Sequence, residues 1–174
     1  MTGASIKFSM ADKQIAAVMG SLRRLGGQDR AMLLRAIGVG LVEATREHFD
    51  TATDPTGQPW KALLPAYAAM KSGPGILRER GMSGGLQGSI TFNVANANTV
   101  EWGSNKVYAA IHQFGGVIQP KAAKALVFRL GESLVLARRV TIPARPYLGF
   151  GSIEQEAVQD ATEVIFARAI SGHR

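Results

Sequence analysis

Hydrophobic positions along the chain follow two spacings, the three-to-four-residue spacing of a helix and the two-residue spacing of a strand. A short strand is predicted over residues 6–10 and an amphipathic helix over residues 15–25. A longer helix is predicted over residues 28–49. Its inner stripe consists of Leu33, Ile37, Leu41, Ala44 and His48.

Two glycines lie inside the longer helix, where each costs about 1 kcal/mol relative to alanine. We therefore expect another backbone, from this chain or from a neighbouring subunit, to approach the helix closely at Gly38 and Gly40. On its outer side, Arg46 and Asp50 are four residues apart, so we expect them to form an ion pair.

The middle of the chain has the alternation of two β-hairpins. Residues 90–94 and 100–102 flank an asparagine-containing turn, and residues 126–130 and 134–142 flank the turn Gly131-Glu132-Ser133. The second hairpin is predicted to bury Leu126, Phe128, Leu130, Leu134, Leu136, Val140 and Ile142. Arg138 falls on that apolar side, so it either lies at the margin of the sheet or pairs with an acid.

Three further helical segments complete the pattern. Short helices are predicted from Pro65 and over residues 108–114, and a long one from Ser152, with Ser152 and Gln155 as its capping box. The order predicts an α+β fold, with an antiparallel sheet of about four strands packed with a long N-terminal helix pair and a C-terminal helix. The length suits one domain, residues 1–174, and the glycine-rich segment 71–85 is predicted to be a flexible loop.

Charge is concentrated in one part of the chain. The net charge is +7, and residues 106–145 hold a single acid, Glu132. The basic residues there are Lys106, Lys121, Lys124, Arg129, Arg138, Arg139 and Arg145. Such a cluster points to an anionic partner, either nucleic acid or an acidic protein face. The alternative is a solvated strand face whose cations discourage edge pairing.

Composition excludes several classes of protein. The chain has no cysteine, so disulfide scaffolds, thiolate zinc sites and cysteine nucleophiles are excluded. No stretch approaches the roughly 20 apolar residues of a membrane-spanning helix, and residues 1–6 do not have the pattern of a secretory signal. We expect no membrane partner, and a protein that is used in a cytoplasm or built into something assembled there.

Candidate chemistry is sparse. No two histidines have helical zinc-ligand spacing and no serine lies in a Gly-x-Ser-x-Gly motif, so we expect no catalytic residue, metal or cofactor. A hydrolase built on Asp54, Glu101 or His112 is the enzymatic alternative. Most aromatic residues fit a core: Trp60, Phe92, Trp102 and Phe114. Tyr147, in a proline-containing loop, is expected to anchor that loop to the body or to a neighbour.

Four segments carry a family resemblance. They are DPTGQPWKAL (54–63), VYAAIHQFGG (107–116), QPKAAKAL (119–126) and VTIPARPYLG (140–149). Together they resemble the phage virion morphogenesis family, the tail-completion and neck proteins of tailed and Mu-like bacteriophages. The similarity runs from about Gln28 to the end of the last helix. Residues 77–89 do not follow the family's pattern Leu-x-x-Thr/Ser-Gly-x-Leu-x-x-Ser, and the difference indicates an insertion in this region.

The resemblance implies a non-enzymatic structural protein that acts in tail completion or head–tail joining, as a ring-forming subunit of the neck or tail. Its implied partners are other copies of itself and neighbouring neck, tail or connector proteins, with DNA passing through the ring. Its implied location is the virion, after assembly in the host cytoplasm. The candidate subunit-contact or DNA-lumen residues are Lys121, Lys124, Arg138, Arg139, Arg145 and Tyr147.

Two alternatives remain open at this point. Arg145 either binds a carboxylate across a subunit contact or caps a helix end within its own chain. For the whole protein, the alternative function is nucleic-acid binding through the basic segment 106–145.

Overall fold

The computed structural model of the chain describes residues 20, 25–79 and 85–171. The elements are α2 (Gly27–Thr51), α3 (Pro65–Met70), the 3-10 turn η1 (Gln87–Ser89), β1 (Ile90–Asn96), β2 (Thr99–Ser104), α4 (Ala109–Phe114), β3 (Gly116–Ile118), β4 (Leu126–Leu130), β5 (Ser133–Ala137), β6 (Val140–Ile142) and α5 (Ser152–Ser171). Helices with antiparallel strands confirm the α+β class. The strand expected at residues 6–10 and the helix at residues 15–25 lie outside the described residues, apart from Gly20 and Leu25. The single-domain assignment stays a prediction.

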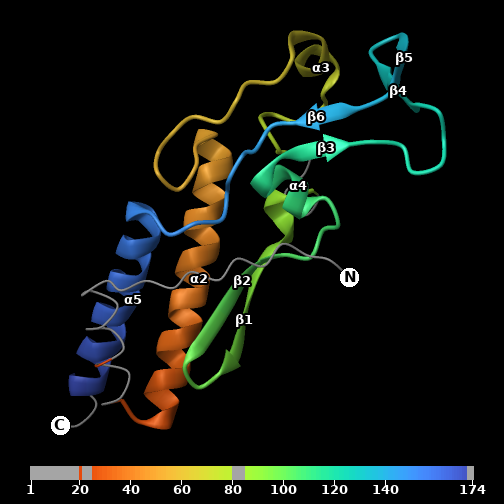
Figure 1. Cartoon of the computed structure of the whole chain (residues 1–174). Coiled ribbons are helices and arrows are strands. Elements are labelled where there is room, and N and C mark those ends of the chain that lie inside the picture. Colours follow the sequence, from red (N-terminus) through yellow and green to blue (C-terminus); the bar gives the residue numbers. More distant parts are fainter. Residues whose placement is uncertain (1–19, 21–24, 80–84, 172–174) are drawn as a thin grey trace.

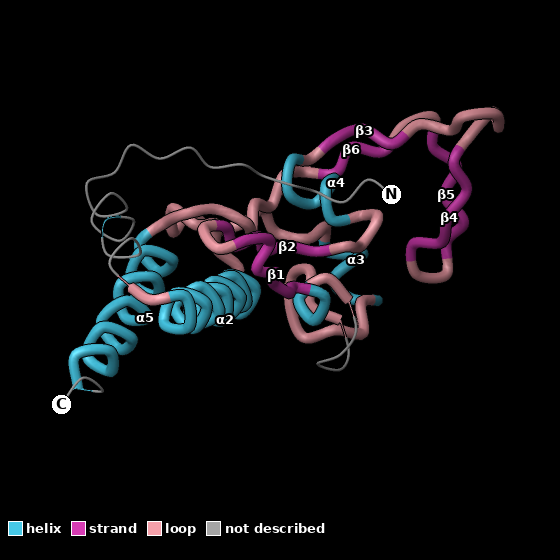
Figure 2. The backbone as a smooth tube through the Cα atoms, turned by 90° about the horizontal axis from the view of Figure 1, so that it is seen from below, coloured by secondary structure: helices cyan, strands magenta, loops and turns pink. Residues whose placement is uncertain are grey.

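Helix α2 is the centre of the body. It packs against α5 on one side and against the β1–β2 hairpin on the other (Figures 1 and 2). The predicted inner stripe of α2 is confirmed, because all five of its residues are buried. The stripe is apolar over most of its length, so packing rather than helix propensity stabilises the helix.

The two glycines of α2 are explained by close contacts on both sides of the helix. A Cβ atom at Gly38 would lie 2.2 Å from the ring of Phe92 in β1, and one at Gly40 would lie 3.1 Å from Cβ of Ala157 in α5. The expected close approach of a neighbouring backbone is therefore confirmed at Gly40, where α5 crosses within this chain. At Gly38 an aromatic side chain fills the space instead.

The strands form three separate two-stranded ladders, β1–β2, β3–β6 and β4–β5, in place of one sheet of about four strands. The predicted hairpins are present, but the segment 134–142 is broken between Ala137 and Val140. Its second half pairs as β6 with the short strand β3, which sequence reasoning did not predict. Arg138 lies exposed at this break, which agrees with a place at the margin.

The register of the β4–β5 hairpin corrects which leucines share a face. Leu134 and Leu136 were expected on the inner side with Phe128, but they are 60% and 67% exposed. The ladder pairs Phe128 with Val135, so Leu134 and Leu136 lie on the face opposite to Phe128. Phe114 was also expected in the core and is 60% exposed, because α4 buries only its inner side, through Ala109 and Gln113.

Two local predictions on the helices need correction. Arg46 pairs with Glu43 at 2.7 Å rather than with Asp50, because Asp50 is within 3.2 Å of Arg78 from the following loop. The predicted start of α5 is confirmed, but its cap is shifted by one residue. Gly151 accepts the first helical hydrogen bond, and the carboxylate of Glu154 accepts a bond from the Gly151 N–H at 2.9 Å.

The segment predicted to be a flexible loop, 71–85, falls partly outside the described residues. Its first half, residues 71–79, forms turns in which Lys71 donates to the carbonyl oxygen of Arg78. Among the described residues, no helix combines the length and the apolar character needed to cross a membrane.

Candidate functional site

Three of the four segments that carry the family resemblance, 54–63, 107–116 and 140–149, meet in a buried joint between α4 and the loop that precedes α5. The fourth segment, 119–126, leads into β4 and is largely exposed. Gln113, at the end of α4, is 5% exposed. Its Oε1 accepts hydrogen bonds from the backbone N–H groups of Tyr147 and Leu148, both at 3.0 Å, and its Nε2 donates to the Leu148 carbonyl at 2.8 Å. One side chain therefore satisfies three backbone groups of an irregular segment that has no ladder partner.

Gly115 sets the geometry on the other side of the joint. Its φ of 71° and ψ of −179° lie in a region that is essentially restricted to glycine. A Cβ atom there would be 2.7 Å from the amide nitrogen of Ala144. Gly115 thus lets α4 end and β3 begin directly against the loop. Gly116 has no positive φ, and ordinary contacts surround it.

Arg145 and Tyr147 are held inside the chain, so neither is a free surface group. Arg145 is 5% exposed and donates from Nε to the Lys61 carbonyl at 2.9 Å and from a terminal nitrogen to the Ala62 carbonyl at 3.4 Å. Of the two alternatives for Arg145, the structure shows bonds to carbonyls of its own chain, although these belong to a loop rather than to a helix end. Burial lowers the pKa of the guanidinium, which still keeps its charge because the ordinary value is so high.

Tyr147 is fully buried against Phe49, with ring centroids 5.1 Å apart. Its hydroxyl donates to the Ala109 carbonyl at 3.2 Å, and burial raises its pKa to about 12. Trp60 adds a hydrogen bond from its indole N–H to the Pro146 carbonyl at 2.7 Å. Tyr147 therefore anchors its loop to the body of the same chain, which was one of the two expected roles.

The residues considered for a hydrolase are not brought together. Within the described ranges, no hydrogen bond or ion pair joins any two of Asp54, Glu101 and His112. The carboxylate of Asp54 accepts bonds from the backbone N–H groups of Thr56 and Gln58 and so closes its own turn. The described residues also hold no cluster of three metal-ligating side chains.

His112 is half-buried in the joint. Burial lowers its pKa from 6.5, and the positive charge of Arg145 lowers it further. Its ring contacts Tyr108 edge-on, at a centroid distance of 6.0 Å, and its Nδ1 is buried without a hydrogen-bond partner. These contacts describe a histidine kept neutral inside the joint.

A second buried polar contact joins α2 to α5. His48 and Glu154 are 1% and 0% exposed, and His48 Nε2 lies 2.8 Å from Glu154 Oε1. Sequence reasoning placed His48 on an inner stripe, but it did not predict its contact with Glu154. The pair fixes the register of the two helices, because a misplaced α5 would bury both polar groups without partners.

The basic segment forms a projecting arm, defined here as residues 120–139 and containing the β4–β5 hairpin (Figures 1 and 2). The exposed basic side chains of the arm are Lys121, Lys124, Arg129, Arg138 and Arg139. None of them forms an ion pair within the described part of the chain. The turn of the hairpin contacts α3, where the Gly131 N–H lies 3.0 Å from the sulfur of Met70.

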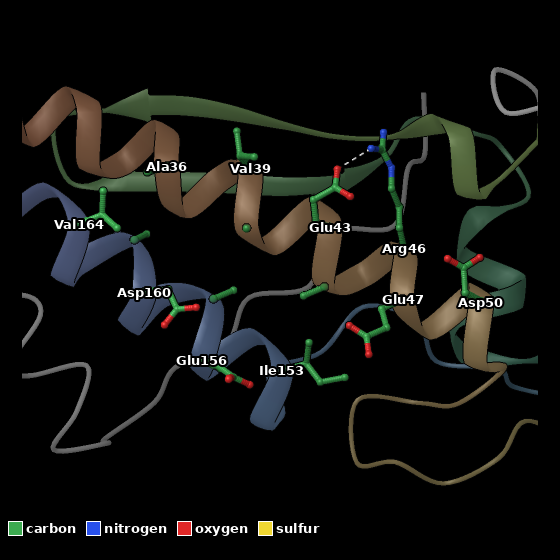
Figure 3. Close-up of a pocket in the computed structure, with 14 residues that line it drawn as sticks. Ala36, Val39, Glu43, Arg46, Glu47, Asp50, Ile153, Glu156, Asp160 and Val164 are labelled. Atoms are coloured by element: carbon green, nitrogen blue, oxygen red, sulfur yellow. Dashed lines mark hydrogen bonds and ion pairs between the residues drawn. The ribbon is translucent and has the colours of Figure 1, made fainter.

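A groove of about 840 Å³ is lined by residues of α2 and α5 (Figure 3). Its floor is apolar and includes Val39 and Val164, which are 52% and 66% exposed. Acids from both helices line it: Glu43, Glu47, Asp50, Glu156 and Asp160. The sequence periodicity could not reveal this groove. It places the acids of α2 and of α5 on the polar side of each helix, but it does not show that these two polar sides lie next to each other.

Comparisons with known proteins agree with the motif segments. The model of the phage virion morphogenesis family matches residues 10–167. The chain is 31% identical over 137 residues to the "Putative capsid assembly protein G" of Escherichia phage Mu, a match that covers 77% of each chain. It is 32% identical over 119 residues to the "Mu-like prophage FluMu G protein 2" of Haemophilus influenzae, covering 68% of this chain and 65% of that protein. No solved structure matches the chain. The chain therefore belongs to the phage virion morphogenesis family.

Proposed function

We propose that this protein is a structural subunit that completes the tail or joins head and tail, and that it acts as a ring at the neck of the particle. The observation that carries the proposal is the arm, whose exposed apolar and basic residues have no partner among the described residues. Exposed apolar residues grouped on one element are typical of a surface that binds another protein. Family membership supports a role in assembly.

The buried joint gives the arm a fixed base. Both ends of the arm continue into the β3–β6 ladder, and β6 leads into the loop held by Gln113. Pro143 and Pro146 restrict the backbone of that loop, so little conformational entropy is left to lose when the arm docks. The residues of the family motifs thus position a contact surface, and association rather than bond-making is the proposed activity.

The proposal is tested by imaging particles that assemble without this protein. Separate filled heads and finished tails are the expected result, and supplying the intact gene in trans should restore joined particles. Tails of abnormal length would contradict the joining role and would indicate that the protein terminates the tail. Normal, infectious particles would refute any structural role at the neck.

Nucleic-acid binding is the second candidate, supported by the five exposed cations of the arm. In a ring, these cations would line the passage for DNA. Each phosphate contact contributes about 0.9 to the slope of log affinity against log salt. We expect the triple variant Lys121→Glu/Arg138→Glu/Arg139→Glu to flatten that slope if the arm binds DNA. An unchanged slope would exclude the arm as the DNA-binding element.

A further inference from the structure

The arm and the groove have complementary surfaces. On the arm, Val127 lies opposite Leu136 and Arg129 lies opposite Leu134, so these four residues share one face of the hairpin. The three apolar members of this face are 60% to 67% exposed. An apolar strip beside a cation therefore faces away from the body.

The groove has the opposite charge and the same apolar character. Among the described residues, no ion pair joins Glu47, Glu156 or Asp160 to a cation. The one basic residue among the described residues that line it, Arg46, is bound to Glu43. Figure 3 shows Glu47 from α2 and Glu156 and Asp160 from α5 along the same groove. Acids without partners around an exposed apolar floor favour a partner that is both apolar and basic.

The two surfaces lie at opposite ends of the molecule. The arm extends from one end of the body, beyond α4, and α2 and α5 form the other end, in both of the views that show the whole chain (Figures 1 and 2). An arm in this position does not fill the groove of its own chain. A contact between two different surfaces of identical chains is heterologous, and such contacts close into rings when the rotation between neighbours allows it.

We propose that the arm of one copy docks into the groove between α2 and α5 of the next copy, and that this contact builds the ring. The apolar face of the hairpin covers Val39 and Val164, while cations of the arm pair with Glu47, Glu156 and Asp160. This inference rests on the proposed ring-forming function. It gives the cations of the arm a protein partner instead of DNA.

Cysteine cross-linking tests the contact directly, because the natural chain has no cysteine. Leu136→Cys on the arm and Val164→Cys in the groove are combined in one full-length chain and oxidised inside assembled particles. A disulfide needs Cα atoms within about 7 Å, so only a seated arm forms one. The expected result is a ladder of covalent oligomers that ends at the size of the ring.

The matched control combines Leu136→Cys with Ile170→Cys. Ile170 is also on α5 and is 73% exposed, but it does not line the groove. This control should give no ladder. Equal ladders from both pairs, or no ladder from the groove pair in complete particles, would overturn the docking proposal. If complete particles form but the groove pair gives no ladder, the docking proposal fails and the proposed function remains. If normal particles form without the protein, the proposed function itself is refuted.

A charge exchange supplies a second measurement that does not depend on oxidation. Glu156→Lys/Asp160→Lys reverses the groove, and Arg138→Glu/Arg139→Glu reverses the arm. We expect each reversal alone to weaken self-association at least tenfold in light scattering, and the two reversals together to restore it to within about threefold. Arg35→Glu/Arg168→Glu, on exposed positions outside both surfaces, is the control for net charge.

The remaining occupants of the groove are outcomes of the same tests. A disulfide within one chain between Met10→Cys and Val164→Cys would assign the groove to the chain's own N-terminal segment and overturn the proposal. Suppose that Arg138→Glu/Arg139→Glu abolishes DNA binding while Leu136→Cys/Val164→Cys still cross-links. The cations of the arm then bind DNA, and only the apolar part of the proposed contact is right. That result would overturn the proposed ion pairs.

Discussion

Replacement of Gln113 by alanine is the sharpest test of the buried joint. The substitution leaves the N–H groups of Tyr147 and Leu148 and the carbonyl of Leu148 without partners, in positions that are 0% and 4% exposed. A buried polar group that loses its partner costs about 1–3 kcal/mol. At the low end of that range, three such groups give a loss of about 3–5 kcal/mol, a large part of the 5–15 kcal/mol that is typical of a domain.

The assay is urea unfolding followed by circular dichroism, with thermal unfolding as a second probe. For a chain of this length, 1 kcal/mol corresponds to about 2–4 °C in Tm, so we expect Tm to fall by about 6–20 °C. Gln113→Leu separates hydrogen bonding from volume, because it fills the space but restores none of the three bonds. We expect it to be nearly as destabilising as Gln113→Ala.

The control is Gln58→Ala, which truncates an exposed glutamine whose side chain forms no hydrogen bond with the residues that the structure describes. Its effect should stay within about 0.5 kcal/mol. A Gln113→Ala variant as stable as this control would refute the assignment of Gln113 as the residue that holds the loop. Full rescue by Gln113→Leu would show instead that packing, not hydrogen bonding, stabilises the joint.

Three further substitutions test the other buried contacts. Gly115→Ala should cost about 1–3 kcal/mol or more in the free energy of unfolding, because only glycine adopts its backbone conformation readily; an unchanged urea midpoint would contradict the observed φ. Glu154→Ala should cost about 3–5 kcal/mol because it leaves His48 buried without its partner, and Glu154→Gln should cost less since an amide can keep a hydrogen bond to that ring; equal losses would argue against the bond. His112 should make stability depend on pH: burial, then the charge of Arg145, holds its folded-state pKa below 6.5, so its contribution is present above pH 6.5 and is lost as pH falls through the folded-state pKa. Urea unfolding between about pH 7 and 5 should therefore show a steeper loss in the natural protein than in His112→Asn, and parallel curves would show that the ring does not titrate in this way.

The buried joint has a consequence for how the family motifs are understood. Arg145 and Tyr147, which the sequence suggested as candidates for subunit contacts, bind groups of their own chain. Buried residues of this kind would hold the base of the arm rigid, and a contact surface needs a rigid support to keep its geometry. In the docking proposal, the contact residues lie on the arm and in the groove instead.

The amino-acid sequence by itself determined the local elements of this protein. The stripe of Leu33 to His48 defines α2 because a helix returns to the same face every three to four residues, and that rule needs no knowledge of the partner. The hairpin turn at Gly131, the start of α5 near Ser152 and the cluster of positive charge are equally local. The motif segments also sufficed to indicate the family.

Only the tertiary structure decided which of these surfaces meet. Alternation indicates two faces of a strand but not which face is covered, so Leu134 and Leu136 were placed on the wrong side. Charge spacing along one helix likewise could not show that Arg78 competes for Asp50. The pairing of His48 with Glu154, the burial of the proline loop and the acid-lined groove between α2 and α5 join segments that are far apart in the sequence, with separations of 34 residues for Gln113 and Tyr147 and of 106 residues for His48 and Glu154. Such contacts depend on how the elements pack, and local periodicity carries no information about packing between distant segments.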